Sequence, residues 1–348
     1  MKRKKIVIIG GGFAGSYAAK KLEKDFDVTL VDSKDYFEFT PGVLRTIVEP
    51  QHIKKIQILH THYLKRAKVI MGIVSEISKN YLLANNKKIS FDYLVICSGS
   101  SYNPPFKEKK IVIAARAKHL RESYKCLCEA KRILIIGGGL VGVELAAEIT
   151  THYDNKKITI INMSDRLIER NPPKAIKHAE KFLKKRGVKI IYNEMVITQK
   201  TKNLFLTDKG NKFSADIAFL CTGITPNFDF MKKNFSNKLD KSNQIKVNDY
   251  LQVQGVKNIF SAGDINDRAV EKTAQNAERQ AGIVVKNIRA LENKSELYSY
   301  SSKKTPLVIS LGKYNGIFSW DKLTFTGIIP GIMKTLIEKY IMFRHKFL

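Results

Sequence analysis

Two copies of one glycine pattern constrain this chain more than any other feature of its 348 residues. The first lies in "KIVIIGGGFAGSYAAKKL". The second lies in "KRILIIGGGLVGVELAAEIT", 127 residues further on (137 minus 10). Each follows a short apolar run and opens a helix-like stretch, which is the context of a dinucleotide-binding turn. One such motif is weak evidence, but two in this context predict two Rossmann-like units and two dinucleotides.

The first motif has a complete βαβ context. We predict a strand over 5–9, a helix over 14–24 and a second strand, "DVTLVD", that ends on Asp32. Glycines allow the backbone to approach a pyrophosphate at the helix N-terminus, and a terminal acid can accept the ribose hydroxyls. The alternative is a Rossmann-like unit without a dinucleotide, which the terminal acid disfavours. The residues predicted to hold this dinucleotide are Gly10, Gly12, Phe13, Ala14, Gly15, Asp32 and Ser33.

The second motif has the same glycines, Gly137, Gly139 and Gly142, before a predicted helix over 140–150. Its second strand, "KITIIN", ends on Asn162 instead of an acid, and Arg166 follows closely. An acid at this position binds a free ribose 2′-hydroxyl, whereas a nearby arginine accommodates a 2′-phosphate. The sequence therefore leaves open whether the ribose of the second dinucleotide carries a 2′-hydroxyl or a 2′-phosphate.

A larger unit repeats around the two motifs. Each is followed by an alternating, turn-rich segment and then by a second apolar strand, predicted for the first copy at Tyr93 to Cys97. This pattern is typical of a small antiparallel meander that leads into a buried strand. Downstream, a helix is predicted over 274–291.

The chain carries a formal charge of +29, from 61 Lys and Arg against 32 Asp and Glu. Such a charge indicates an anionic partner, or a lysine-rich but solvated surface. Of the four cysteines, Cys97 and Cys221 lie in apolar runs and are predicted to be buried. Cys126 and Cys128 lack metal-ligand spacing, so no metal site is expected. His60 and His62 have no third ligand nearby and are predicted on a solvated strand or loop.

With these pieces in order, the chain resembles two-dinucleotide FAD- and NAD(P)-linked oxidoreductases of the pyridine nucleotide-disulfide oxidoreductase fold. The resemblance implies an α/β architecture of two Rossmann-like three-layer units, the second inserted in the first. It implies an FAD-binding domain over 1–105 and 240–300, an NAD(P)H-binding domain over 106–239 and a C-terminal α+β interface region over 301–348. The segment "IFSAGDIN", with Gly263 and Asp264, resembles a second FAD fingerprint in which the acid binds the ribityl chain. "SGS" and "TGITPN" resemble the motifs beside flavin and nicotinamide, which implies cofactor contacts for Ser98, Gly99, Thr222 and Gly223.

Within this superfamily the chain is similar to type II NADH:quinone oxidoreductases, and more narrowly to the apoptosis-inducing-factor-homologous, ferroptosis-suppressor branch. "GGGLVGVELAAEI" implies that Glu144 lies near the contact of nicotinamide and flavin; the alternative is an acid favoured by the helix dipole. "KTAQNAERQAG" implies that Thr273, Ala274 and Gln275 lie against the flavin ring; the alternative is a helix surface. The resemblance further implies Arg45 near the flavin and Lys339 at its active-site edge.

The resemblance implies hydride transfer from NADH or NADPH to FAD, followed by two-electron reduction of a quinone. Sulfide:quinone reductases need paired catalytic cysteines, and two cysteines on one local segment match that need poorly. A ferredoxin or rubredoxin reductase stays open, because a basic surface could dock an acidic protein. A redox-sensing flavoprotein with nucleic-acid affinity has only the charge in its favour, so no specific nucleic acid is expected.

The tail "GIIPGIMKTLIEKYIMFRHKFL" is predicted as an amphipathic helix, with Ile332, Leu336 and Tyr340 among its apolar positions. Two interpretations stay open: a helix packed on the core or in a homodimer, and a helix lying on an anionic membrane surface. No stretch has the apolar length of a membrane span, and the run 6–9 is too short for a signal peptide. We therefore expect a cytoplasmic protein, peripheral on the inner face of a membrane.

Overall fold

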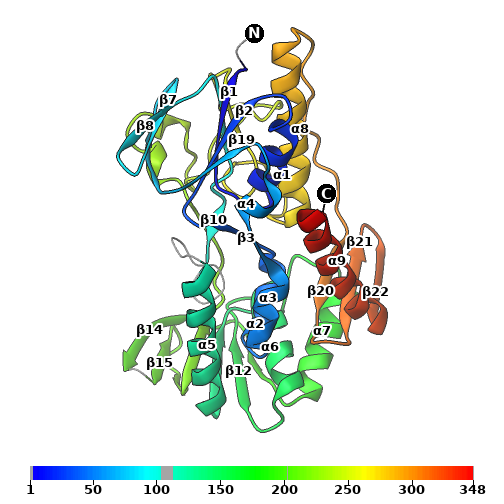
Figure 1. The fold of residues 1–348 in the computed structure, drawn as a ribbon. Helices are drawn as coiled ribbons and strands as arrows, with labels where there is room; N and C mark the ends of the chain where they lie inside the picture. Colours follow the sequence, from blue (N-terminus) through cyan, green and yellow to red (C-terminus); the bar gives the residue numbers. More distant parts are fainter. Residues whose placement is uncertain (1–2, 103–112, 202, 348) are drawn as a thin grey trace.

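Two parallel sheets, each built around one glycine motif, organise the chain (Figure 1). The computed structural model describes residues 3–102, 113–201 and 203–347. The first sheet has five strands, and the apolar residues of its inner strands are mostly buried because helices and loops cover both faces. Its strands, in spatial order, are β19 (Ile259–Ser261), β9 (Tyr93–Ile96), β1 (Lys5–Ile9), β2 (Asp27–Asp32) and β5 (Lys68–Met71).

Helices α1 (Phe13–Leu22) and α8 (Ala274–Glu292) pack against each other beside this sheet. Their contact depends on small and branched apolar residues such as Ala18, Leu22, Ala281 and Val284, all fully buried. The last strand and helix of this unit thus come from far along the chain, and they close a sheet that begins at residue 5.

The second sheet has the order β13-β12-β11-β17 and repeats the same parallel pairing. Its elements are β11 (Arg132–Ile136), α6 (Leu140–His152), β12 (Lys157–Ile161), α7 (Pro173–Lys185), β13 (Lys189–Ile191) and β17 (Ile217–Leu220), with α5 (Ile113–Glu129) packed alongside. The predicted helices at 14–24, 140–150 and 274–291 are confirmed, each end lying within two residues of α1, α6 or α8. The predicted two-unit α/β fold is therefore confirmed.

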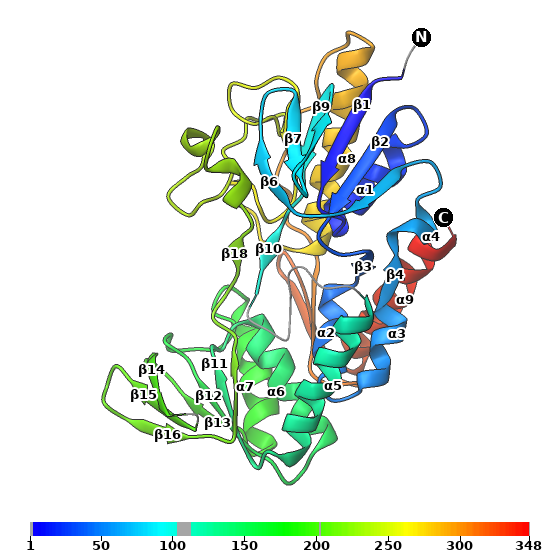
Figure 2. The ribbon, with the colours of Figure 1, turned by 60° about the vertical axis from the view of Figure 1, so that its left-hand side comes forward.

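A three-stranded antiparallel meander accompanies each sheet, as the repeat predicts. The meanders are β6 (Val74–Ile77), β7 (Tyr81–Ala84) and β8 (Lys87–Ser90), and β14 (Val196–Thr201), β15 (Leu204–Thr207) and β16 (Lys212–Ser214). The chain enters the second unit through β10 (Ser100–Ser101) and returns through β18 (Thr225–Pro226). These two strands pair antiparallel, so one narrow ribbon joins the units, as Figure 2 shows.

Short elements between β2 and β5 extend from the first unit toward the second. They are β3 (Tyr36–Glu38), α2 (Val43–Thr46), α3 (Ile53–Ile56), β4 (Gln57–Leu59) and α4 (His60–Tyr63), with 3₁₀ turns at Thr40–Gly42 and Pro50–His52. Two further 3₁₀ turns lie at Asp229–Met231 and Ser236–Lys238.

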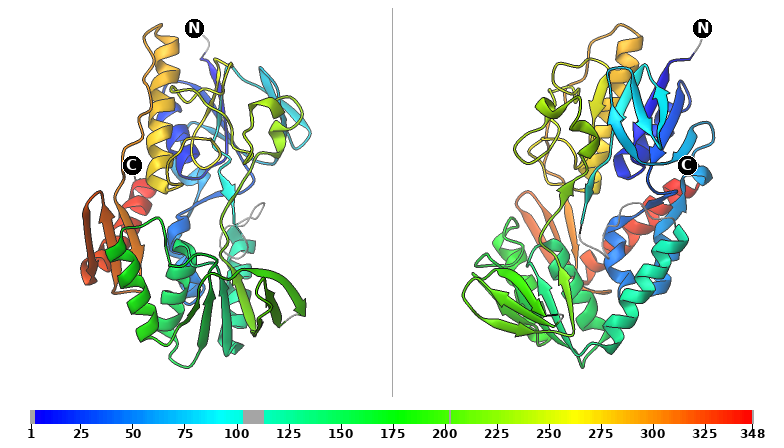
Figure 3. Two further views of the ribbon diagram at one scale, coloured as in Figure 1. Left: turned by 180° about the vertical axis from the view of Figure 1, so that it is seen from behind. Right: turned by 90° about the vertical axis from the view of Figure 1, so that its left-hand side faces the viewer.

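The C-terminal region forms an antiparallel sheet and a long helix that lie across both units (Figure 3). The sheet consists of β20 (Leu307–Ser310), β21 (Gly316–Trp320) and β22 (Leu323–Gly327), and helix α9 (Ile328–Phe347) packs on it. Helix α9 also contacts α3, α4 and β4 of the first unit. It therefore borders the space between the two glycine motifs.

Candidate functional site

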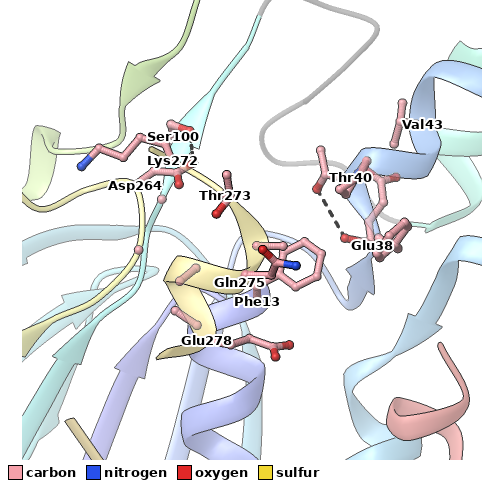
Figure 4. A pocket seen from close by; sticks show the side chains of 18 of the residues that line it. Phe13, Glu38, Thr40, Val43, Ser100, Asp264, Lys272, Thr273, Gln275 and Glu278 are labelled. Carbon is pink, nitrogen blue, oxygen red and sulfur yellow. Dashed lines mark hydrogen bonds between the residues drawn. The ribbon is translucent and has the colours of Figure 1, made fainter. Parts of the chain in front are cut away.

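A cavity of about 440 Å³ lies where the first unit, the second unit and helix α9 meet. This volume falls within the range of small-molecule sites. Figure 4 shows one side formed by Thr273 and Gln275 and another formed by Glu38, Thr40 and Val43. The predicted residues that line the cavity are Gly10, Gly12, Phe13, Ala14, Asp32, Ser33, Ser98, Gly99, Glu144, Gly263, Asp264, Thr273, Ala274 and Gln275.

The first glycine turn leaves room for a pyrophosphate. Gly10 has φ of +91°, a conformation that favours glycine. Gly12 caps helix α1 without a side-chain hydrogen bond, and no acid lies in the first turn. A Cβ atom at Gly12 would meet nothing within 4 Å, whereas one at Gly15 would lie 1.7 Å from the Gly10 carbonyl oxygen. The space beside Gly12, at the N-terminus of α1, is thus open for an FAD pyrophosphate, and Gly15 permits close helix packing.

Asp32 is fixed at the end of β2 chiefly by three groups, with a longer bond from the Ser33 hydroxyl. Its Oδ2 atom accepts the Gly11 N–H at 2.7 Å and lies 3.1 Å from His60 Nε2, while the Lys34 N–H reaches Oδ1 at 3.2 Å. Burial opposes ionisation, but the interaction with His60 and the charge of Lys34 lower the pKa of Asp32 below its usual value. The ionised carboxylate can therefore accept ribose hydroxyls. His60 is fully buried on α4, so the expectation of a solvated strand or loop is wrong there.

The second glycine turn repeats this geometry with an amide. Asn162 Oδ1 accepts the Gly138 N–H at 2.9 Å, just as Asp32 accepts that of Gly11. Gly139 caps helix α6 without a side-chain bond, and Gly142 lies against the Gly137 carbonyl. Arg166 is exposed and ion-paired to its neighbour Asp165. Two further predicted residues, Thr222 and Gly223, are exposed in the loop before β18.

Glu144 lies on the first turns of α6 and points to the C-terminal region. Its Oε1 atom accepts the backbone N–H of Ser310 at 2.7 Å and the Lys334 ammonium at 3.0 Å. The Glu144 and Lys334 side chains are only 11% and 16% exposed. Both residues line the cavity, so a carboxylate from the second unit and an ammonium from α9 form one ion pair at its edge.

Lys339, the basic residue expected at the flavin edge, does not reach this cavity. It is exposed and lies on the far side of α9, five residues from Lys334 and so roughly 140° further around the helix. The structure assigns the cavity position to Lys334. The sequence pattern showed Lys334 only as one of several polar residues of an amphipathic helix, and no local signal distinguished it.

The start of helix α8 faces the cavity. Thr273 caps this helix by accepting the Asn276 N–H at 3.3 Å, and the next residues, Ala274 and Gln275, line the cavity. Gln280 is buried two turns further on and accepts the Gly263 N–H at 2.7 Å, which positions the loop that carries Asp264. Ser100 donates to Asp264 at 2.6 Å. These contacts hold one wall of the cavity rigid.

Glu38 and Arg116 form a buried ion pair that the sequence did not predict. Arg116 of α5 donates to both Glu38 carboxylate oxygens, at 3.1 and 3.3 Å, and is fully buried. Burial raises the pKa of Glu38, but the charges of Arg116 and Lys34, together with the hydrogen bonds from Arg116 and Gln57, lower the pKa below its ordinary value. Because Glu38 lines the cavity, this pair ties α5 to the cavity wall.

Arg45, expected near the flavin, instead pairs with Glu148 of helix α6 at 3.0 Å. It lines a second depression of about 870 Å³ between α3 and the outer side of α9. We call this depression the basic groove, because Lys54, Lys55, Lys313 and Lys339 also line it. Its contact with helix α6 makes Arg45 a link between the two units.

The cysteines offer no redox pair at the cavity. Cys97 lines it, but burial raises the pKa of its thiol to about 12, and the buried Cys221 behaves likewise. Cys126 and Cys128 are exposed on α5, two residues apart and so on different sides of the helix. Among the residues that the structure describes, no group of three or more His, Cys, Asp or Glu could hold a metal ion.

Comparison with protein sequences identifies relatives that cover most of this chain. The family model for pyridine nucleotide-disulphide oxidoreductases matches residues 4–281. Apoptosis-inducing factor homolog A of Dictyostelium discoideum is 35% identical, over 96% of this chain and 89% of its own length. Ferroptosis suppressor protein 1 of Homo sapiens is 30% identical, over 90% of this chain and 87% of its own length.

Solved structures share the fold at lower identity. The sulfide:quinone oxidoreductase of Aquifex aeolicus superposes with a TM-score of 0.85 at 20% identity, covering 99% of this chain and 91% of the other. NDH2 of Plasmodium falciparum in complex with NADH superposes with a TM-score of 0.83 at 15% identity, covering 99% and 98%.

Proposed function

Because the chain belongs to the pyridine nucleotide-disulphide oxidoreductase family, we propose that it is an FAD-dependent NAD(P)H:quinone oxidoreductase. As a family member it is a pyridine-nucleotide-dependent flavoprotein that uses FAD with NADH or NADPH. Bound FAD supplies a ring that accepts a hydride from the nicotinamide and passes two electrons to the acceptor. The finer proposal concerns that acceptor, a quinone reduced to a quinol.

Different groups of residues bind FAD and orient the nicotinamide. The turn at Gly10 to Gly12 and Asp32 hold the pyrophosphate and adenosine ribose of FAD, and Asp264 holds its ribityl chain. The N-terminus of α8, at Thr273 to Gln275, directs backbone N–H groups to the ring and favours negative charge there. Glu144, braced by Ser310 and Lys334, orients the nicotinamide.

The observation that carries the quinone proposal is the two-sided character of helix α9. One side contributes Ile337 and Ile341 to the cavity wall, next to Val308 and Ile309 of β20. The other side leaves large apolar residues in solvent. A helix that lines the cavity and is apolar outside can bring a lipid-soluble acceptor from a membrane to the ring, whereas a protein acceptor would stay at the surface.

The proposed reaction is tested with purified, FAD-loaded protein. We expect NADH or NADPH to be oxidised with a short-chain ubiquinone analogue and the quinol to accumulate in equal amount. If the enzyme reduces a ferredoxin-type protein but forms no quinol, the alternative of a protein acceptor is favoured. Salt-sensitive DNA binding with negligible quinone turnover would favour the redox-sensing one. Measuring the rate with NADH and with NADPH shows whether Asn162 and Arg166, in place of an acid, allow the enzyme to use NADPH.

We further propose that α9 docks on an anionic membrane surface. Five of its exposed apolar residues, which we call the apolar stripe, are 48% to 64% exposed and recur every three or four positions. They are Ile332, Leu336, Tyr340, Phe343 and Phe347. The lysines of the basic groove flank the stripe, as in interfacial helices that combine apolar insertion with attraction to acidic lipids. None of the helices in the described part of the chain has the length and apolar character needed to cross a membrane.

Replacing Leu336 and Phe343 together by glutamate is expected to lower vesicle binding at least ~10-fold, because two apolar side chains leave the interface and two charges enter it. Co-sedimentation with phosphatidylglycerol-containing vesicles measures this, and the wild-type binding should weaken as salt is raised. Ile197→Glu, at a residue that is 54% exposed in the second unit, is the matched control. If both variants bind vesicles like the wild type, α9 is not the docking element. A concentration-dependent dimer that Leu336→Glu dissociates would instead show that a second copy covers the stripe.

A further inference from the structure

A buried cluster of side chains joins the end of helix α9 to the ribose-binding acid. His60 lies between Asp32 and Tyr63, with Nε2 3.1 Å from the Asp32 carboxylate and Nδ1 2.7 Å from the Tyr63 hydroxyl. His345 of α9 packs edge-on against the Tyr63 ring and stacks on the Phe37 ring, with centroids 5.3 and 3.9 Å apart. None of these contacts is explained by the proposed reaction.

The directions of the hydrogen bonds follow from the partners. The Asp32 carboxylate can only accept, so His60 Nε2 donates to it. Burial, followed by the nearby Asp32 charge, raises the pKa of Tyr63 well above its usual value, so its hydroxyl keeps its proton. That hydroxyl donates to His60 Nδ1 whenever this atom carries no proton. Tyr63 thereby favours the ring form and orientation in which His60 faces Asp32.

His345 is held in the same way. The Ile341 carbonyl, 3.0 Å away, can only accept, so His345 Nδ1 donates to it. Burial lowers the pKa of His345 to about 4, so near neutral pH its Nε2 atom accepts, and Ser16 lies 3.2 Å from it. Ser16 directly follows Gly15 on the pyrophosphate-binding helix α1. The last turns of α9 therefore contact both the pyrophosphate helix and the residues behind the ribose acid.

We propose that His60 and His345 are positioning residues of the FAD site. His345 holds Tyr63 and His60 in place, and His60 fixes the Asp32 carboxylate for the adenosine ribose. Since His60 and the Gly11 N–H both occupy Asp32 Oδ2, the carboxylate cannot rotate freely, and Oδ1 is left with only the longer bonds from Lys34 and Ser33. The end of α9 is thus part of FAD retention. This inference does not depend on which acceptor the enzyme reduces.

The test is the dissociation constant of the deflavinated protein for FAD, followed by quenching of flavin fluorescence. His60→Gln keeps a donor for Asp32, whereas His60→Met, of similar size, has none. We expect His60→Met to raise the dissociation constant about 10-fold or more, as for loss of a bond to a charged group, and His60→Gln to recover most of the affinity. His62→Ala is the matched control, because His62 is exposed two residues away on the same short helix.

Two further measurements separate positioning from general stability. In a protein that already carries Asp32→Asn, His60→Met should raise the dissociation constant for FAD by less than about 3-fold. A residue that acts through the Asp32 carboxylate has little effect once that carboxylate is absent. Melting of the apo proteins reports any loss of folding directly. His345→Ala should also weaken FAD binding, with faster flavin loss on dilution. The proposal is overturned if His60→Met and His62→Ala bind FAD equally well, or if His345→Ala retains FAD like the wild type. It is also overturned if the fold-changes in the FAD dissociation constant caused by Asp32→Asn and His60→Met simply multiply in the double variant.

Discussion

Gly12→Ala is expected to give a folded protein that no longer retains FAD, whereas Gly15→Ala is expected to destabilise the protein itself. A Cβ at Gly12 meets no atom within 4 Å, so only the pyrophosphate would collide with it. A Cβ at Gly15 would lie 1.7 Å from the Gly10 carbonyl oxygen, which is a collision between backbone segments. We expect roughly 100-fold weaker FAD binding for Gly12→Ala, and about 3 kcal/mol or more of lost stability for Gly15→Ala.

Flavin absorbance of the purified proteins and melting of their apo forms measure the two effects separately. The second motif supplies a matched pair of variants, Gly139→Ala and Gly142→Ala. A Cβ at Gly139 would meet no atom within 4 Å, whereas a Cβ at Gly142 would lie 2.0 Å from the Gly137 carbonyl oxygen. Gly139→Ala should stay yellow but resist reduction by either nicotinamide nucleotide. A Gly12→Ala protein with a full complement of FAD would refute the assignment of the first turn.

Lys334→Met is expected to slow flavin reduction by the nicotinamide nucleotide about 100-fold while leaving FAD bound. Without the ammonium, Glu144 keeps only the Ser310 N–H, and a poorly solvated carboxylate is left uncompensated at the cavity edge. Hydride transfer is sensitive to small displacements of the nicotinamide, so a displaced Glu144 carboxylate is expected to slow it. Stopped-flow absorbance under anaerobic conditions measures this step apart from reoxidation.

The double variant shows whether the two residues act as a pair. Glu144→Gln should also slow flavin reduction, and Glu144→Gln with Lys334→Met should be no slower than the slower single variant. Lys339→Met decides which lysine acts at the edge of the active site. The sequence resemblance assigns this position to Lys339, whereas the geometry of the cavity assigns it to Lys334. Slow flavin reduction in Lys339→Met, with normal rates in Lys334→Met, would reverse our assignment.

The two-unit fold could be predicted because its signals are local. Apolar strands, glycine turns and the acid at Asp32 all lie within about thirty residues of each other, which is the span of a βαβ unit. The burial of Cys97 and Cys221 could be predicted for the same reason, since each directly follows an apolar strand, β9 or β17. Glu144 could be singled out because the segment around it, "GGGLVGVELAAEI", carries the family resemblance.

The contacts that complete the site could not be predicted because they join distant parts of the chain. Glu144 and Lys334 are 190 residues apart, Ser16 and His345 are 329 apart, and Glu38 and Arg116 are 78 apart. No spacing rule applies at such separations. The apolar tail illustrates the same limit: its pattern predicted one apolar face, but Ile337 and Ile341 line the cavity while Leu336 and Tyr340 face solvent.

The inserted topology also sets the order in which the protein can be built. The second unit is continuous from β11 to β17 and can fold as soon as it has been synthesised. The first sheet must wait for β19, and its cofactor pocket must wait for α8 and α9, although its glycine turn is made first. We therefore expect a nascent chain to present a finished nicotinamide unit beside an open flavin unit. We expect FAD to enter as the last component and to stabilise the assembly only once helix α9 is in place.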